Sequence, residues 1–379
     1  MVVDIAIVGC GPSGLALAGI FERSGFSYVV YERSAHDVPP RGGCLDLHPG
    51  TGQLAMEEAG CYEKFKEFGR VGDYTVHQVW SPQGEKVFKW GVGEDQPELD
   101  REQIKQALLT TIEKGRIEWR KKVTSSERNE KGQILLKFED GTTAKGFKLV
   151  IGADGLRSKI RHLVTPAKPK YSGFTFWTGE MHTTNPFYPT LEEMAKFGPM
   201  AVFGRSVMIW IQRQGDGHYR LDLGIPCPEE FDKIKGIDLA DAEAVKRFAL
   251  AEFNNGHSEN LKAIIRAIEG PFHAWPLYYM PPDAINWEAS SDVTLIGDAA
   301  HVTTPFVGEG VNMAMKDSVV LARKLKEFGA TLRAVEEYEK EMFPRSREVI
   351  EMSLASGKLC FEWDAPRDGL DRGRRVEWD

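Results

Sequence analysis

The feature that most constrains this chain is the glycine pattern GCGPSG, which begins at Gly9 between an apolar run and a helical pattern. Gly9 permits a tight turn, Gly11 lets the backbone approach a pyrophosphate, and Gly14 lets the helix pack closely on the strand. A second apolar run at 28–31 ends at Glu32, whose carboxylate can accept hydrogen bonds from ribose hydroxyls. The pattern therefore predicts a dinucleotide-binding unit on a parallel sheet, and the motif alone leaves NAD and FAD both open.

Polar or glycine-rich residues follow each of four apolar runs that are typical of buried parallel strands. The runs are 2–8, 28–31, 147–151 and 293–296. Asp154 follows the third run, and Asp298 follows the fourth. Because ligands bind outside the carboxyl ends of strands in open α/β sheets, we expect one site assembled from distant parts of the chain. Asp298 would accept hydrogen bonds there, while the loop leading to Asn312 opens a helix whose N-terminus offers backbone N–H groups.

The pattern between the third and fourth runs changes to that of antiparallel strands. The segment 201–225 predicts two strands around a tight turn at 215–217, and the second strand alternates apolar with polar residues. The segment 174–183 predicts a third strand of the same sheet, and 73–90 predicts a hairpin that could join it. We therefore expect a second, antiparallel sheet.

Composition excludes several other classes of protein. The chain has 379 residues and a net charge of −8, which gives no reason to expect a nucleic-acid partner. Its five widely spaced cysteines contain no CxxC pair, which argues against a metal site or a disulfide framework and suits a reducing compartment. No run approaches the ~20 apolar residues that a membrane span needs. We expect a soluble, cytoplasmic protein that favours the monomer.

Two further stretches, with the glycine motif, carry a family resemblance. GADGLRSKIR (152–161) and LIGDAAHVTTPFVGEGVN (295–312) resemble, in order and spacing, fingerprints of the class A flavoprotein monooxygenases of the aromatic-hydroxylase type. Within that family, RGGCLDLHPGTGQLAMEEAG (41–60) and LDREQIKQALL (99–109) most resemble the tetracycline-inactivating flavin monooxygenases. The resemblance implies non-covalent FAD, NADPH as co-substrate, and O2.

The resemblance also implies a fold class and domain boundaries. We expect an α/β chain in which a Rossmann-like FAD-binding domain is interleaved with a mainly antiparallel substrate domain and followed by C-terminal helices. The FAD-binding domain would comprise 1–72, 98–170 and 277–320, the substrate-binding domain 73–97 and 171–276, and the helices and tail 321–379. After residue 312 one helical face carries Met315, Val319 and Ala322, and the helical pattern runs to roughly residue 356.

Carried over by position, the resemblance assigns individual roles. Glu32 and Arg33 would meet the adenosine end, and Asp298 the ribityl or pyrophosphate portion. Arg41 would help receive NADPH, and Asp154 would support both the FAD and the NADPH site. The full set of expected cofactor-binding residues is Gly9, Gly11, Ser13, Gly14, Glu32, Arg33, Arg41, Asp46, Arg101, Asp154, Asp298, Pro305, Gly308, Gly310, Val311 and Asn312.

The implied reaction is hydroxylation of an aromatic or polyketide-like small molecule through a flavin C4a-hydroperoxide. It needs no protein nucleophile, so no catalytic side chain is expected. Thr178, Trp210 and Phe306 are the expected substrate contacts. Thr178 and Pro199 stand where the tetracycline-inactivating enzymes have Gln and Arg, so we expect tetracycline to be a poor substrate.

Two rival functions stay open. One is another flavin oxidoreductase on the same fold, such as a halogenase or a double-bond reductase, although the Trp-x-Trp-x-Ile-Pro segment of the halogenases is missing. The other is a non-catalytic flavin-binding redox sensor. Substrate-dependent NADPH oxidation would exclude the sensor as the whole function, and a reductase would oxidise NADPH without consuming O2.

Several residues also have simpler structural interpretations. Arg101 could pair on the surface with Asp100 or Glu102, and Cys44 fits a small buried hydrophobe better than a flavin attachment site. His48 and His301 fit packed or capping residues better than acid–base groups. Four aromatic residues could line a substrate pocket, although core packing is favoured for at least two of them: Trp177, Trp210, Tyr219 and Trp275.

Overall fold

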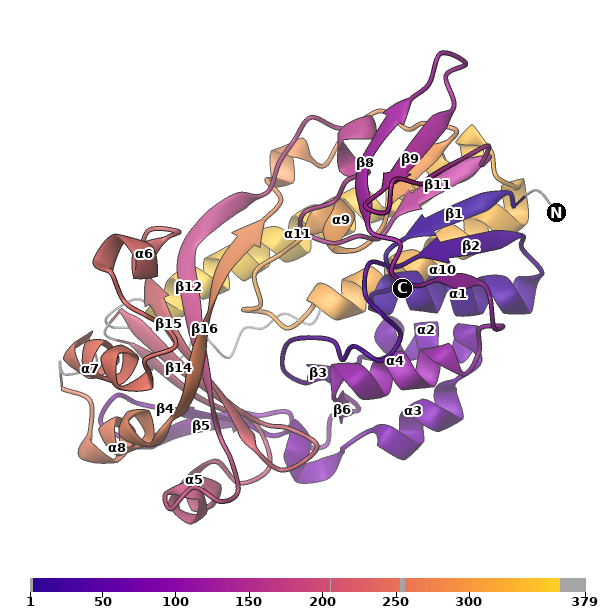
Figure 1. Cartoon of the computed structure of the whole chain (residues 1–379). Helices are drawn as coiled ribbons and strands as arrows, with labels where there is room; N and C mark the ends of the chain where they lie inside the picture. Colours follow the sequence, from indigo (N-terminus) through magenta and orange to yellow (C-terminus); the bar gives the residue numbers. More distant parts are fainter. Residues whose placement is uncertain (1–2, 205, 253–255, 362–379) are drawn as a thin grey trace.

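A computed structural model describes residues 3–204, 206–252 and 256–361 (Figure 1). The charged segment 365–379, expected to fray, lies outside the described residues. Two β-sheets dominate the molecule, one parallel and one antiparallel, as the sequence predicted. In Figure 1 the long strands β12 and β16 run side by side from one half of the molecule to the other.

The parallel sheet is built from segments that are far apart in the sequence. Its strand order is β17-β11-β1-β2-β7, and all four pairings are parallel. The strands are β1 Ile5–Val8, β2 Tyr28–Tyr31, β7 Ile117–Glu118, β11 Leu149–Gly152 and β17 Val293–Leu295. Each of the four apolar runs predicted as buried strands is in this sheet, so that prediction is confirmed.

Helices pack against the parallel sheet and against one another. They are α1 Pro12–Ser24, α2 Gly52–Ala59, α3 Tyr62–Phe68, α4 Arg101–Leu109, α9 Asp298–His301 and α10 Gly310–Phe328. Helix α1 contacts α2, α4 and α10, and its apolar side chains join those of the sheet in the largest core of the molecule. Helix α10 begins at Gly310, two residues before the predicted start.

The antiparallel sheet has seven strands in the order β16-β12-β15-β14-β13-β4-β5, and all its pairs are antiparallel except β13 with β4, which is parallel. They are β4 His77–Trp80, β5 Lys86–Trp90, β12 Lys170–Met181, β13 Met200–Gly204, β14 Val207–Arg213, β15 Tyr219–Pro226 and β16 Glu269–Tyr279. One face packs into a second core with residues of α5 Tyr188–Ala195, α7 Ala242–Glu252 and α8 Glu259–Ala267. The other face carries Thr178, Trp210 and Asp222 and meets the rest of the molecule.

The structure contains strands that the sequence analysis did not predict. The segment 201–225 forms three strands, because the chain turns after Gly204, whose φ of +116° is unfavourable for other residues. Strand β16 was not predicted. Neither was a three-stranded sheet of β8 Val123–Arg128, β9 Ile134–Phe138 and β10 Thr143–Lys145, nor the short pair β3 Leu45–Asp46 and β6 Glu98–Leu99.

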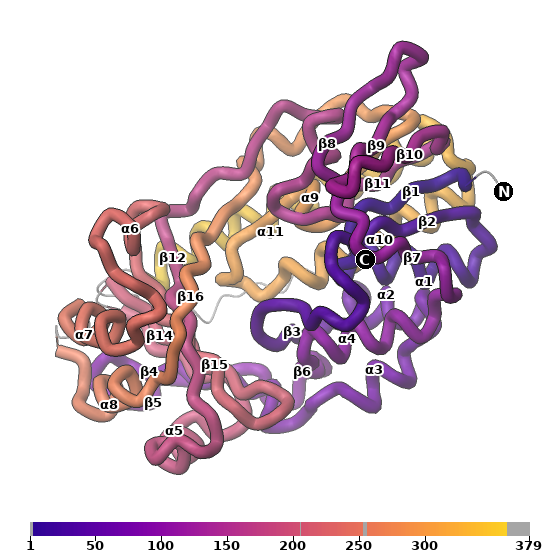
Figure 2. The backbone as a smooth tube through the Cα atoms, in the orientation of Figure 1, coloured from indigo at the N-terminus to yellow at the C-terminus, as the bar shows by residue number. Residues whose placement is uncertain are grey.

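One long helix connects the two halves. Helix α11 Leu332–Phe361 contacts α10 and α9 near the parallel sheet and β13 and β14 of the antiparallel sheet. In the backbone tube of Figure 2 its yellow coil runs behind β12 towards the half that holds the parallel sheet. Among the described residues, no helix is long and apolar enough to cross a membrane.

Candidate functional site

The turn between β1 and α1 depends on close backbone contacts at two of its three glycines. Gly9 has a φ of +110°, and a Cβ there would lie 2.3 Å from the carbonyl oxygen of Ala153. A Cβ on Gly14 would lie 2.2 Å from the carbonyl oxygen of Gly9. By contrast, a Cβ on Gly11 would meet no heavy atom within 4 Å. The outer glycines therefore serve packing, whereas Gly11 faces open space that a ligand can enter.

The N-terminus of α1 lies at this open space. Gly11 is its N-cap, and no side chain caps the helix. The Glu32 carboxylate, at the end of β2, accepts hydrogen bonds from the backbone N–H groups of Cys10 (2.9 Å) and Ser34 (2.8 Å). The uncapped N–H groups can bind an anion such as a pyrophosphate, as the glycine pattern predicts. Arg33 is exposed beside this turn, and Ser13 is buried beneath it, against Gly297.

A buried aspartate fixes the turn that carries Asp298. Asp317 of α10 is fully buried and accepts hydrogen bonds from the Gly297 N–H (2.9 Å), from Arg345 (2.6 Å) and from His301 (2.5 Å). Burial alone would raise the pKa of Asp317, but His301 and Arg345 hold it below its ordinary value. His301 is thus a packed, ion-paired residue, and Asp317, which the sequence analysis did not single out, sets the direction of the turn.

Asp298 follows β17, the last strand of the parallel sheet in the sequence. Its side chain is exposed, yet desolvation by the surrounding protein is the largest cause that raises its pKa, against the opposing charges of His301, Arg101 and Arg161. The carboxylate therefore keeps contact with solvent although protein atoms surround much of it. Within the described residues its carboxylate oxygens form no hydrogen bond, so they are free to accept one from a ligand.

Arg101 reaches the same region from the start of α4. Its Nε donates to the Gly43 carbonyl (3.2 Å), and burial lowers the pKa of its guanidinium while Asp298 raises it. The alternative pairing with its neighbours is not formed, because Asp100 pairs with Arg70 (2.9 Å) and Glu102 with Lys105 (3.7 Å). The guanidinium therefore keeps donors available for a phosphate or a flavin oxygen.

Asp154 and Arg41 occupy different positions at the site. Asp154 follows β11 beside Gly9, and one of its oxygens accepts from the Lys159 N–H (2.6 Å). Its other oxygen is buried without a hydrogen-bond partner, and burial raises its pKa. Arg41 is exposed on the loop before β3 and contacts none of the other predicted site residues in the described hydrogen bonds and ion pairs.

The loop after β3 is fastened to the start of α10. Asn312 is fully buried; its amide donates to the Asp46 carbonyl (3.0 Å) and accepts from the His48 N–H (2.8 Å). The His48 ring lies between Asp46 (2.8 Å) and Glu309 (3.1 Å). The Asn312 side chain is therefore used within the protein, and the predicted loop residues Pro305, Gly308, Gly310 and Val311 surround the start of α10.

The three predicted substrate contacts lie on two neighbouring surfaces. Thr178 and Trp210 both flank Asp222 in adjacent strands, so they share one face of the antiparallel sheet. Thr178 donates to Asp222, and Arg220 donates both to Thr178 (3.0 Å) and to Asp222 (3.0 Å). Arg220 and Asp222 are polar residues of the alternating strand predicted within 201–225, but Asp222 is 7% exposed and faces the interior of the molecule.

Phe306 belongs to an apolar wall beside that face. Its ring lies 5.8 Å from Phe174 and 6.0 Å from Phe176, and it packs with Phe361 at the end of α11. Trp210 and Trp275 pack against the same cluster. Trp177 and Tyr219 instead lie in the core on the opposite face of the sheet, so two of the four aromatic residues serve packing.

Cys44 lies in a polar network. Its thiol donates to Asp100 (3.0 Å) and accepts from Arg70 (2.8 Å), and burial raises its pKa well above the ordinary value. The thiol is thus neutral and held by hydrogen bonds, which fits the structural interpretation. No group of three or more His, Cys, Asp or Glu residues that could hold a metal ion occurs in the part of the chain that the structure describes.

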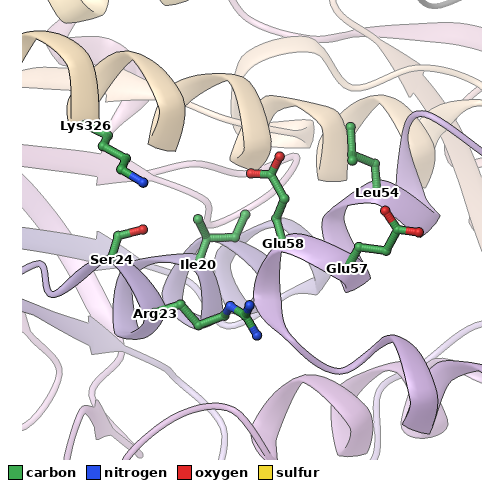
Figure 3. Close-up of a pocket in the computed structure, with 7 residues that line it drawn as sticks. All are labelled: Ile20, Arg23, Ser24, Leu54, Glu57, Glu58 and Lys326. Carbon is green, nitrogen blue, oxygen red and sulfur yellow. The ribbon is translucent and has the colours of Figure 1, made fainter.

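A surface pocket lies apart from these residues (Figure 3). It is formed by α1, α2 and α10 and lined by Ile20, Arg23, Ser24, Leu54, Glu57, Glu58 and Lys326. It contains none of the predicted site residues, and its lining mixes both signs of charge. The predicted cofactor-binding residues lie instead around the carboxyl ends of β1, β2, β11 and β17 and the starts of α4 and α10.

The parallel strand order, the glycine turn before α1 and the acidic residue after β17 are typical of a dinucleotide-binding protein of the α/β class. The sequence matches the profile of the FAD binding domain family at residues 2–190 and 286–353, which is more than half of the chain. The chain therefore belongs to this family, and it is an FAD-dependent monooxygenase of the class A, aromatic-hydroxylase type.

Individual relatives agree with this assignment. The monooxygenase asqM of Emericella nidulans is 28% identical, with 94% of this chain and 95% of the relative covered. The 3-amino-4-hydroxybenzoate 2-monooxygenase PtnB3 of Streptomyces platensis is 27% identical, with 97% and 90% covered. The crystal structure of tetracycline destructase Tet(51) shares the fold, with a TM-score of 0.70, 20% identity, and 98% and 95% of the chains covered.

Proposed function

We propose that FAD binds across the carboxyl ends of the parallel strands, with its adenosine end at Glu32 and Arg33 and its pyrophosphate at Gly11 and the N-terminus of α1. Asp298 would accept hydrogen bonds from the ribityl hydroxyls. Arg101 and Asp46 would contact the flavin, whose electron-rich end would lie at the start of α10. The observation that carries this proposal is the Asp298 carboxylate, which follows β17 at the carboxyl end of the parallel sheet, is partly desolvated and has no hydrogen bond within the described residues.

We further propose that the protein hydroxylates an aromatic or polyketide-like small molecule with NADPH and O2. When bound, the flavin supplies the electron transfer and oxygen activation that no side chain can provide. The chain itself would bind the substrate on the face of the antiparallel sheet and exclude water. Trp210, Phe176 and Phe306 would contact a flat ring, and Arg41 and Asp154 would help to receive NADPH.

The polar side of this surface favours a substrate with a small polar group on its ring. Thr178, Asp222 and Arg220 bind one another, so the remaining Arg220 donors and the free acceptor sites of Asp222 would be the groups that bind a substrate hydroxyl, and the Arg220 donors those that bind a carboxylate. The similar enzyme from Streptomyces platensis acts, by its name, on an amino-hydroxybenzoate, which is a ring of this type. Thr178 and Pro199 offer no charged contact to a tetracycline, which we propose to be a poor substrate.

The binding proposal is tested with a matched pair of substitutions. Asp298→Ala should weaken FAD binding by roughly ten- to a hundredfold, since a hydrogen bond to a charged group is worth about 1.5–3 kcal/mol. Asp292→Ala is the control, because Asp292 lies on the same segment but pairs with Arg128 (2.9 Å) near the surface. FAD affinity is measured by titrating each FAD-free variant. Equal affinities would exclude Asp298 from the site.

The activity proposal is tested by a survey of aromatic compounds. A substrate should accelerate NADPH consumption, consume O2, and yield a product that is heavier by one oxygen atom. NADPH oxidation without O2 uptake would favour a reductase. Failure of every aromatic compound, with FAD bound, would contradict the proposed substrate class and leave the cofactor assignment intact.

A further inference from the structure

A cluster of ionisable groups joins the loop after β3 to the start of α10. The His48 ring nitrogens lie 2.8 Å from an Asp46 carboxylate oxygen and 3.1 Å from a Glu309 carboxylate oxygen. The side chains of His48 and Glu309 are only 13% and 11% exposed. Glu309 is the N-cap residue of α10, so the cluster lies where the proposed flavin would approach that helix.

The geometry sets the charge of the His48 ring. A neutral imidazole carries one N–H and can donate to only one of the two carboxylates, whereas a protonated ring can donate to both. Burial lowers the pKa of His48, but the hydrogen bonds and charges of Asp46 and Glu309 outweigh it and raise the pKa to about 10. The ring is therefore an imidazolium at neutral pH, and the three side chains together carry one negative charge.

The neighbouring ionisable groups do not replace this cation. Burial lowers the pKa of His77, whose ring stacks on Trp90 at 4.6 Å, so His77 is neutral. Burial raises the pKa of Glu98, the strand partner of Asp46, to about 8, so Glu98 is mostly protonated at neutral pH. Lys316 of α10 points its ammonium at the Gly50 carbonyl (2.9 Å), away from the pair of carboxylates.

We propose that His48 is a positioning residue that holds the loop after β3 against the N-terminus of α10. Its positive charge also compensates the Asp46 and Glu309 carboxylates, which would otherwise destabilise negative charge on the bound flavin. This inference rests on the proposed FAD site. A reduced flavin carries negative charge, which a helix N-terminus stabilises and nearby carboxylates destabilise. Without the imidazolium, Asp46 and Glu309 would face each other and the flavin as uncompensated charges.

Substitution of His48 separates this role from simple packing. His48→Gln keeps a hydrogen-bonding side chain of similar length but removes the cation. We expect a more negative midpoint potential for bound FAD and weaker FAD binding. Adding Glu309→Gln to His48→Gln should restore most of the potential, because one of the two opposing charges is then removed. His162→Gln is the control, since His162 is exposed and bonds only to the Ser126 carbonyl (3.0 Å).

A second measurement uses the FAD-free protein, so that the inference and the FAD site can fail separately. The imidazole NMR signal that His48→Gln removes should titrate with a pKa far above the ordinary 6.5, near 10. Titration near 6.5 would overturn the ion cluster whether or not FAD binds. Should His48→Gln not fold, Glu309→Gln alone should shift the potential of bound FAD to a more positive value.

The remaining outcomes also decide between the two proposals. Titration of His48 near 10 in a chain that binds no FAD would refute the proposed function and the flavin role of His48 together, but not the cluster. An unchanged midpoint potential in His48→Gln, with FAD bound, would overturn the proposal for His48 alone.

Discussion

Two glycines three residues apart, Gly11 and Gly14, have separable roles in the turn after β1. A methyl group on Gly11 meets nothing within 4 Å, whereas one on Gly14 would lie 2.2 Å from the Gly9 carbonyl oxygen. The Gly9 backbone cannot retreat easily, because its N–H is bonded to the Tyr31 carbonyl at 2.9 Å. The same chemical change should therefore damage ligand binding at one position and folding at the other.

We expect Gly14→Ala to destabilise the FAD-free chain by about 1–3 kcal/mol, even though alanine is the better helix former. Gly11→Ala should leave that stability nearly unchanged, because its φ of −75° suits alanine, but should reduce FAD affinity. Thermal unfolding without FAD and titration with FAD measure the two effects. Wild-type FAD affinity in Gly11→Ala would show that the open space is not the cofactor's path.

Single residues also mark the limit of what the sequence could predict. Gly9 and Gly14 belong to a glycine motif that directly follows an apolar run, and Asp298 also follows such a run, so their places in the fold could be predicted. The role of His48 depends on Glu309, which lies 261 residues away in the sequence, and a local sequence pattern cannot predict such a partner. Asp222 was a polar residue on an alternating strand, and only the packing of the two halves shows that this polar face is covered.

Helix α11 is tied to the parallel sheet by a buried carboxyl group. Glu339 is 1% exposed and accepts from the Trp287 Nε1–H (3.1 Å) and from the Thr294 hydroxyl of β17 (2.8 Å). Burial raises its pKa from 4.5 to about 7, although these two hydrogen bonds lower it. Because the folded-state pKa is the higher one, the folded chain holds the proton more strongly, and stability from this group is lost as pH rises from 4.5 to 7.

Glu339→Gln should remove this part of the pH dependence, since glutamine cannot ionise. The variant should therefore gain stability relative to the wild type as pH rises from about 4.5 to above 7. Urea unfolding at the two ends of this range measures the change. Glu351→Gln, an exposed substitution on the same helix, should leave the slope as it is. Parallel curves for wild type and Glu339→Gln would contradict the assigned pKa.

At the level of helices and strands, long apolar runs and clear alternation were predicted best. The four parallel strands and the hairpin at 73–90 have strong patterns, and each is present. The strands β8 and β10 were not predicted, because several of their residues are exposed and polar. Such residues have no clear alternation, and their strands form through pairing with β9 in the folded chain. The secondary structure of such segments could not be predicted from the propensities of their own residues.

The two halves of the molecule should unfold together. Helix α11 packs on elements of both halves, contacting α10 and α9 on one side and β13 and β14 on the other. A ligand that binds only the folded chain stabilises it by about 2.7 kcal/mol at a concentration of one hundred times its Kd. We expect calorimetry to show one transition that moves to higher temperature as FAD is added, and a smaller shift for Asp298→Ala at equal FAD. Two transitions, only one of them sensitive to FAD, would contradict this coupling.

The position of β17 has a consequence for how the protein is made. This strand pairs with β11, but the whole stretch between residues 152 and 293 must be synthesised before it appears. At ribosomal speeds of roughly 5–20 residues per second, β11 waits on the order of ten seconds with an unpaired edge. An open edge of apolar residues is a template for pairing with another chain. Slower translation of this middle region would therefore lengthen the interval in which nascent chains can aggregate.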